Sequence, residues 1–338
     1  MFVIDFIYTK HFSPSGLLSI HSRWRNIKND WRNNVNAYNS YVRREKEKER
    51  AQMEKQRMEA IENCKRNIVR NWADFRQALA NHEFAYNDLD RALHTIFLQV
   101  FDDFFRNGYA YLEKRISDIL HVDNHVVRAA RIKAGDSAPD YNRFIPDADY
   151  IEEDNRFSPP RVEWLYLAFA QACGPLPGGL SVAEECALKE CRALSGEHFA
   201  LCDFKTNEKF ANDLVIDLTI AKGKSISELE NQFNARANQI LYSEKPQTVV
   251  RKELEKCNVE FFMNVYAKLL ADQIFLPVDS ADKSVMYAPF QCMAQYILSK
   301  GYSGIVYAST VYPAGNNIVL FDKTAADPCG KIRLIDIP

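Results

Sequence analysis

The chain has 338 residues, enough for two domains of ordinary size. Its 43 basic and 45 acidic residues nearly balance, which argues against a dedicated nucleic-acid-binding protein, because such proteins need a basic surface. No apolar run approaches the roughly 20 residues of a membrane-spanning helix. The apolar segment at residues 1–8 lacks the basic residues of a signal peptide. We therefore expect a cytoplasmic protein that binds neither nucleic acid nor membrane.

Helices are predicted for most of the first 120 residues. Of the 12 glycines and 13 prolines, only Pro14, Gly16 and Gly108 lie there, and both residue types interrupt helices. Residues 29–71 form a polar pattern typical of one long solvated helix. Further amphipathic helices are predicted at 85–105 and, after a break at Gly108, at 111–120. Apolar residues at helical spacing are expected to face a core: Ile68, Trp72, Phe75 and Leu79.

Strands and helices are mixed in the remainder of the chain, with no regular βαβ repeat, which favours an α+β domain. A buried strand is predicted at 164–168, and further strands at 214–218, 304–309 and 318–322. Ser181 and Glu184 form the pattern of a capping box that opens a helix to about residue 194. Further helices are predicted at 225–242, 247–275 and 286–300.

The eight cysteines contain no Cys-x-x-Cys pair, so neither a zinc knuckle nor a redox pair is indicated. Cys186, Cys191, His198 and Cys202 are close in sequence and leave a metal site as an alternative. Buried free thiols are the simpler interpretation, and we expect no metal. Phosphate-loop, dinucleotide-fold, nucleophile-elbow and zinc-protease motifs are absent from the sequence.

Polar residues at predicted strand ends and loops are the remaining candidates for chemistry. Arginines in such places suit an anionic ligand, because a guanidinium binds phosphate oxygens through a planar fork of donors. The candidates are Arg128, Arg131, Arg156, Tyr166, Glu185, Gln291, Ser309 and Asn317.

Several short motifs follow one another in an order that resembles a known family. They begin with the arginines at 128–132 and the Asn-Arg-Phe-Ser-Pro-Pro segment at 155–160, followed by Leu-Tyr-Leu-Ala at 165–168. Later motifs are Ser-Val-Ala-Glu-Glu at 181–185, Val-Ile-Asp-Leu at 215–218, Tyr-Ala-Pro-Phe-Gln at 287–291, Gly-Ile-Val-Tyr-Ala-Ser at 304–309 and Asn-Ile-Val-Leu-Phe at 317–321. Together they resemble the RES-domain family.

The resemblance implies a domain similar in fold to ADP-ribosyltransferases that acts on NAD+ as substrate. It implies a toxin that depletes NAD+ by hydrolysis or phosphorolysis, paired with an antitoxin protein. Transfer of ADP-ribose to a protein target is the alternative. We expect a helical bundle at residues 1–125, able to mediate homo-oligomers, and a RES-like catalytic domain at 126–325. A helical insertion is expected at about 222–285, and a C-terminal tail at 326–338.

Site residues carried over from the family are Glu185, Arg131 and Ser309 as catalytic residues, with NAD+ contacts from Arg128, Arg156, Tyr166, Gln291 and Asn317. Two assignments stay open. The spacing of Arg128 and Arg131 differs from the family pattern, so either could be the family's arginine. Glu184 competes with Glu185, which we favour because it follows Ser181 by four residues.

The predicted N-terminal helices allow an alternative function. HEPN ribonucleases carry Arg-x(4–6)-His on a helix, and both Arg76–His82 and Arg115–His121 fit this short pattern. A degenerate HEPN-like domain that binds an antitoxin is the interpretation we favour over an active ribonuclease. A third possibility is a module that binds a nucleotide without turnover.

Overall fold

The computed structural model describes residues 35–172, 179–241, 243, 245–274 and 283–338. The chain divides into two compact units, Met1–Asn67 and Ile68–Pro338. The described part of the first unit is a single helix, the start of α3 (Val35–Ala80). This agrees with the long polar helix predicted from the sequence, and the candidate site residues all belong to the second unit.

Apolar residues of the last turns of α3 pack in the core of the second unit, as predicted. Ile68, Trp72, Phe75 and Leu79 are all buried. The Phe97 ring lies 5.2 Å from that of Trp72 and 4.9 Å from that of Phe75, between ring centres. Aromatic pairs at these separations add to the apolar burial that fixes the helix.

The helical segment after α3 differs from the prediction in two places. The helix expected at 85–105 is divided into α4 (Leu89–Ala92) and α5 (Ile96–Leu112). Gly108 does not break a helix, because α5 continues through it to Leu112. The helix expected at 111–120 is replaced by strand β1 (Glu113–Arg115) and the short helix α6 (Ile116–Ile119).

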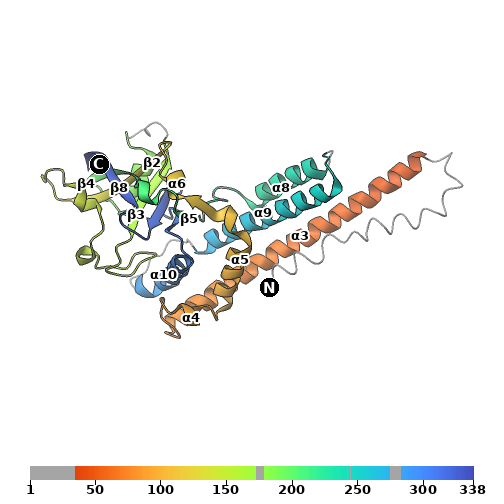
Figure 1. Cartoon of the computed structure of the whole chain (residues 1–338), viewed down its shortest axis with the longest axis horizontal. Helices are drawn as coiled ribbons and strands as arrows, with labels where there is room; N and C mark the ends of the chain where they lie inside the picture. The colour runs from red at the N-terminus through yellow and green to blue at the C-terminus, as the bar shows by residue number, and fades with distance from the viewer. Residues whose placement is uncertain (1–34, 173–178, 242, 244, 275–282) are drawn as a thin grey trace. The chain divides into compact units, whose positions relative to one another are not determined.

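The second unit contains an eight-stranded mixed sheet in the order β1-β5-β6-β7-β3-β2-β4-β8. Figure 1 labels β2, β3, β4, β5 and β8 of this sheet. Every neighbouring pair is antiparallel except β5 and β6, which run parallel with Ile216 opposite Ile305. The strands after β1 are β2 (Asn124–Ile132), β3 (Leu165–Gln171), β4 (His198–Thr206), β5 (Leu214–Asp217), β6 (Gly304–Ala308), β7 (Asn316–Leu320) and β8 (Ala326–Asp336).

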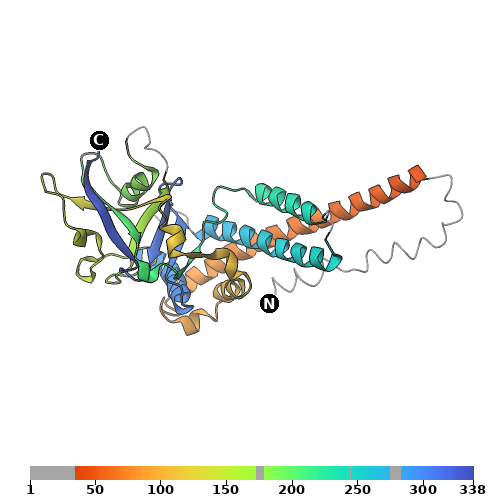
Figure 2. The same ribbon diagram turned by 45° about the horizontal axis from the view of Figure 1, so that its top comes forward.

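Residues expected to form a C-terminal tail belong instead to this sheet. β8 pairs with β4 from Ala326 opposite Thr206 to Asp336 opposite His198 (Figure 2). The strands predicted near β3, β5, β6 and β7 are confirmed, whereas β2, β4 and β8 were not predicted. The fold is α+β, as expected. The domain boundary near residue 125 stays a prediction, and β1 and α6 precede it.

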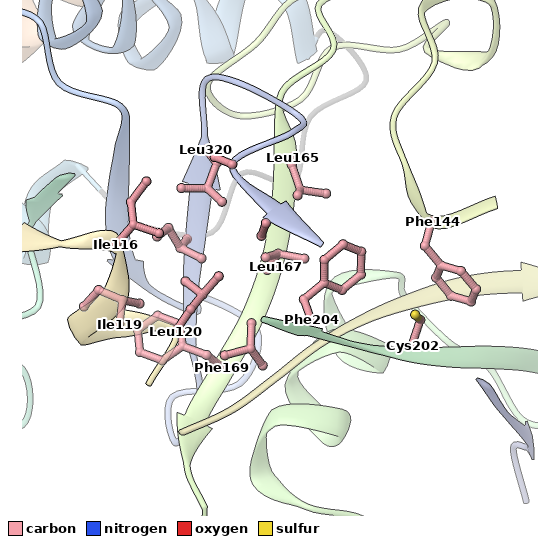
Figure 3. Close-up of a cluster of buried hydrophobic side chains, with 14 of the residues drawn as sticks. Ile116, Ile119, Leu120, Phe144, Leu165, Leu167, Phe169, Cys202, Phe204 and Leu320 are labelled. Atoms are coloured by element: carbon pink, nitrogen blue, oxygen red, sulfur yellow. The ribbon is translucent and has the colours of Figure 1, made fainter. Parts of the chain in front are cut away.

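One face of the sheet buries a large apolar cluster that includes Leu165, Leu167 and Phe169 of β3 with Leu320 of β7 (Figure 3). On the other face, helix α7 (Val182–Glu190) packs on β2 and β3 through Ala183, Cys186 and Ala187. Ser181 accepts a hydrogen bond from the backbone N–H of Glu184, and Glu184 accepts one from that of Ser181. The predicted capping box is therefore present.

Three helices connect β5 to β6: α8 (Ile226–Leu241), α9 (Gln247–Ile274) and α10 (Lys283–Ser299). α8 and α9 run side by side (Figures 1 and 2). On α9, the predicted apolar face is buried at Cys257, Phe261, Val265 and Leu269. No helix of the described part of the chain is both long and apolar enough to cross a membrane.

Candidate active site

A cavity of about 650 Å³ opens between β2, β3, β7, the end of α7, the start of α10 and the loop that precedes β3. Its polar and aromatic lining joins segments that are far apart in the sequence. Four of the eight predicted site residues lie here: Arg128, Arg156, Tyr166 and Asn317. Other lining residues with polar or aromatic side chains are Glu153, Asp154, Trp164, Glu190, Arg192, Tyr287, Tyr307 and Thr310.

The guanidinium group of Arg156 in the cavity is only partly satisfied by hydrogen bonds with the protein. Its Nη2 atom donates a hydrogen bond to Thr310 Oγ1 at 3.2 Å, and its guanidinium lies 5.2 Å from the ring centre of Phe290 and 5.9 Å from that of Tyr287. Its Nη1 atom is buried and has no hydrogen-bond partner among the described residues. A buried donor without a partner costs free energy, so this nitrogen is suited to an anionic ligand.

Arg128 supplies a second positive charge. Its Nη1 atom donates a hydrogen bond to the backbone oxygen of Phe144 at 2.7 Å, which fixes the side chain. Burial lowers the pKa of Arg128 to about 10, so the guanidinium stays charged near neutral pH. Arg192 also lines the cavity and has a φ of 51°, a left-handed conformation that non-glycine residues adopt at an energetic cost.

Two tyrosines stand beside these arginines. The Tyr166 hydroxyl is 2.9 Å from Ser158 Oγ. Burial raises the pKa of Tyr166, and it raises that of Tyr307 well above the usual value. Both therefore remain neutral phenols, which can offer an aromatic surface and a hydroxyl group but no charge.

Glu190, the last residue of α7, is held by two donors. Ser309 Oγ donates to Glu190 Oε1 at 2.8 Å, and Asn317 Nδ2 donates to the same oxygen at 2.5 Å. Ser309 and Asn317 are both buried, whereas Glu190 is exposed on the cavity side. The predicted residues Ser309 and Asn317 are thus brought together, but around a glutamate that the sequence analysis did not select.

Arg131, expected to be catalytic, does not line the cavity. It forms an ion pair with Glu197 at 3.1 Å, and its side chain is 53% exposed. Arg131 is on the same side of β2 as Val127 and Ala129, which line the cavity, but it lies farther along the strand, next to its last residue. Of the two open arginine assignments, the structure places Arg128 in the cavity.

Glu185 also lies outside the lining of the cavity, near Tyr312. Five residues along a helix correspond to about 7.5 Å and to a rotation that changes the face, so Glu185 and Glu190 have different surroundings. Glu184 is buried, caps α7 and pairs with Arg333. The capping role expected for Glu184 is confirmed.

Gln291 contacts the loop that carries Arg156. It is buried on α10, and its Nε2 atom donates to Asp154 Oδ1 at 2.8 Å and to the backbone oxygen of Asn155 at 3.3 Å. These contacts fix the loop that carries Arg156. Gln291 is therefore a positioning residue in this arrangement and does not itself line the cavity.

No group of three or more histidine, cysteine or acidic side chains in the described residues is arranged to hold a metal ion. His198, one member of the alternative metal cluster, pairs with Asp336 at 2.6 Å. Cys186 is buried and lies 3.7 Å from Asn317 Oδ1. These contacts favour structural roles for the cluster.

The fold and cavity define an α+β protein with a site suited to an anionic, partly aromatic ligand. The sequence model of the RES domain matches residues 234–334, which confirms the resemblance to the RES-domain family. The matched segment contains Gln291, Ser309 and Asn317, and it begins within α8, inside the predicted insertion. No curated protein and no solved structure matched the chain.

A RES domain indicates an enzyme that acts on NAD+. This class is consistent with the arginines and aromatic rings of the cavity. The HEPN-like character predicted for the N-terminal helices has no support from the family match, which lies outside them.

Proposed function

We propose that this protein cleaves the bond between nicotinamide and ribose in NAD+. The observation that carries the proposal is the buried, unpartnered Nη1 atom of Arg156 in the cavity. Arg128 and Arg192 line the same cavity, and guanidinium groups suit the negatively charged oxygens of a pyrophosphate. The cavity volume of about 650 Å³ is within the range of small-molecule and cofactor sites.

Each part of the dinucleotide has a suitable counterpart in this proposal. The pyrophosphate binds to Arg156 and Arg128, and the flat rings bind to the aromatic residues, among them Tyr166. A carboxylate on α7 stabilises the positive charge that develops on the ribose when nicotinamide leaves, because that transition state resembles an oxocarbenium ion. The motif comparison selected Glu185, but we assign the role to Glu190, because Glu190 lines the cavity and Glu185 does not.

Hydrolysis, phosphorolysis and ADP-ribosyl transfer share this first step and differ in the acceptor. Purified protein incubated with NAD+, with and without phosphate, distinguishes them by chromatography. Hydrolysis yields nicotinamide and ADP-ribose in both cases. Phosphorolysis requires phosphate, and transfer gives a modified protein. Absence of nicotinamide release under all conditions contradicts the proposal. Unchanged NAD+ that nevertheless binds in calorimetry indicates a binding module.

We also propose a biological role as a toxin that depletes NAD+ and is controlled by an antitoxin protein. Only the family resemblance supports this role. Expression of the chain from an inducible promoter is expected to lower cellular NAD+ before growth stops. Growth arrest with normal NAD+ content would contradict it.

A ribonuclease of the HEPN type is the other candidate, and the geometry does not favour it. Arg76 lies on α3, but His82 follows the helix with a φ of 57°. Arg115 is in β1, and His121 follows α6 and pairs with Asp123. Neither pair therefore lies along one helix, as the motif requires. RNA cleavage that His82→Ala abolishes would reverse this conclusion.

A further inference from the structure

We propose that Trp72 and Phe290 are positioning residues for Arg156: helix α3 holds helix α10 so that two rings of α10 direct the Arg156 guanidinium at the pyrophosphate of the substrate. The inference rests on the proposed function for the identity of that substrate. It depends on the rings beside Arg156, on the contact of one of them with α3, and on the few polar partners of Arg156 itself.

Two aromatic rings of α10 lie beside the Arg156 guanidinium. Its Cζ atom is 5.2 Å from the ring centre of Phe290 and 5.9 Å from that of Tyr287. The two residues are three positions apart, so their side chains lie on the same side of the helix. A guanidinium at such distances is attracted to the rings by a cation–π interaction, which is stronger away from water. α10 therefore presents a paired aromatic surface to this charge.

Hydrogen bonds alone do not fix the direction of this guanidinium. Thr310 accepts from Nη2 at 3.2 Å, and Nη1 has no hydrogen-bond partner among the described residues. A group held through one nitrogen can still turn about that bond, and the rings of Phe290 and Tyr287 restrict this motion. They therefore determine where Nη1 points. Because a charge-assisted hydrogen bond depends on its geometry, the position of the rings affects the affinity for a phosphate oxygen.

The last turns of α3 hold the half of α10 that carries these rings. Phe290 and Trp72 are both buried, and their ring centres are 5.3 Å apart. One turn later on α3, Arg76 Nη2 lies 3.2 Å from Sδ of Met286, the residue before Tyr287. Since protein interiors are close-packed, a smaller side chain in place of Trp72 leaves room for Phe290 to move away from Arg156.

The other end of α10 is held by different contacts. The Tyr296 hydroxyl donates to Asp102 of α5, and Lys300 pairs with the same carboxylate at 2.8 Å. These contacts involve neither Trp72 nor Phe290, so they keep α10 attached when Trp72 is replaced. A substitution of Trp72 is therefore expected to displace the ring of Phe290 and leave the helix in place.

Trp72→Leu in the full chain tests the inference. The KM for NAD+ in nicotinamide release and the Kd for inorganic pyrophosphate in calorimetry are each expected to rise about tenfold. The kcat should change by less than about threefold, because the bond that breaks is separated from the pyrophosphate by the ribose. Trp72→Phe keeps a ring, so it should raise both constants by only about threefold.

Two comparisons distinguish positioning from a general loss of core packing. Phe84→Leu removes a buried ring that contacts Phe75 and, among the described residues, no ring of α10. It should lower Tm and leave KM and Kd at the wild-type values. In the Arg156→Ala background, Trp72→Leu should cause no further rise in either constant, because the group that it displaces is absent.

Failure of the inference and failure of the proposed function are distinguishable. The inference is wrong if Trp72→Leu leaves both constants at wild-type values, if it raises them equally with and without Arg156→Ala, or if wild type binds no pyrophosphate. Should Trp72→Leu not fold, the same criteria apply to Trp72→Phe. If the wild-type chain releases no nicotinamide, the proposed function fails, and the Kd for pyrophosphate still decides the inference.

Discussion

At the residue scale, the side chains of the cavity differ in what they do with their hydrogen-bonding groups. Both ends of the Asn317 amide have protein partners, whereas Arg156 keeps one buried nitrogen without a partner. A side chain of the first kind stabilises the fold, and one of the second kind gains its missing partner only when a ligand binds. The two kinds should respond differently to substitution.

Arg156→Ala is expected to raise the Kd for NAD+ by about 10- to 100-fold, the range for losing a hydrogen bond to a charged group. Arg156→Lys should recover little of this loss, because an ammonium cannot replace the planar fork of donors. Calorimetry measures both. Arg251→Ala removes an exposed arginine on α9 that pairs with Glu255, and it should bind as wild type does. Equal Kd values for Arg156→Ala and wild type would contradict the assignment.

A pair of identical turns allows a test of pH dependence. Asp217 and Asp322 each accept hydrogen bonds from the backbone N–H and hydroxyl of the threonine two residues later. Burial raises the pKa of Asp217, whereas the hydrogen bonds from Thr324 lower the pKa of the exposed Asp322. The raised pKa of Asp217 favours the neutral form in the folded state, so its ionisation near pH 7 reduces stability.

Asp217→Asn is therefore expected to have a higher Tm than wild type at pH 7, and the difference should disappear in acid, where the wild-type carboxyl is protonated. Asp322→Asn should have the opposite sign: a lower Tm at pH 7, with a difference that also disappears as the pH falls. Thermal unfolding of the three proteins between about pH 2 and pH 7, a range that includes the ordinary aspartate pKa of about 3.9, measures this. A lower Tm for Asp217→Asn at pH 7 would refute the first expectation.

At the element scale, the start of α7 joins several parts of the sheet. Ser181 Oγ accepts from the backbone N–H of Glu184 and lies 2.7 Å from His125 Nδ1. The other ring nitrogen of His125 is 2.9 Å from Asp203 Oδ1, which also accepts from Arg333. One capping serine thus connects α7 to strands β2, β4 and β8, and α7 in turn carries Glu190.

Ser181→Ala is expected to lower the free energy of unfolding by at least about 1 kcal/mol, since the cap and the partner of His125 are lost together. Chemical denaturation measures the change. α8 provides the control, because Ser225 and Glu228 form the same capping pattern at an exposed position. Ser225→Ala should cost less. An equal or larger cost for Ser225→Ala would indicate that the contact with His125 contributes nothing.

Elements with clear periodicity and cap signals could be predicted from the sequence, among them α7, α8, α9 and β3. β8 could not, because Pro328 and Gly330 interrupt the strand pattern. β8 lies at the edge of the sheet, where a proline is tolerated. Within the site, motif order identified Arg156 and Tyr166. It led to Glu184 and Glu185 and missed Glu190, because the choice depends on which end of the helix borders the cavity.

At the scale of the whole molecule, the cavity draws on residues from Val127 to Asn317, so a ligand bound there connects most of the second unit. A ligand that binds only the folded state stabilises it in proportion to the logarithm of its concentration over Kd. NAD+ at about 100 times its Kd should stabilise the protein by about 2.7 kcal/mol.

Glu190→Gln is the suitable protein for this measurement, because it should bind NAD+ without consuming it. Its Tm is expected to rise with NAD+ concentration, whereas that of the Arg156→Ala variant should rise much less at the same concentrations. A Tm of Glu190→Gln that does not respond to NAD+ would place the ligand elsewhere or exclude its binding.

The order of strands has a consequence for synthesis on the ribosome. β6 and β7 lie between β5 and β3, so they complete the sheet although β2 to β5 precede them in the chain. Ser309 follows β6 directly and Asn317 lies in β7, so the two donors to Glu190 are synthesised only with these strands. Translation adds about 5–20 residues per second, so several seconds pass between the synthesis of β5 and that of β7. During this time β5 and β3 are not yet connected through β6 and β7. A nascent chain should therefore lack the proposed activity until β6 and β7 have been synthesised.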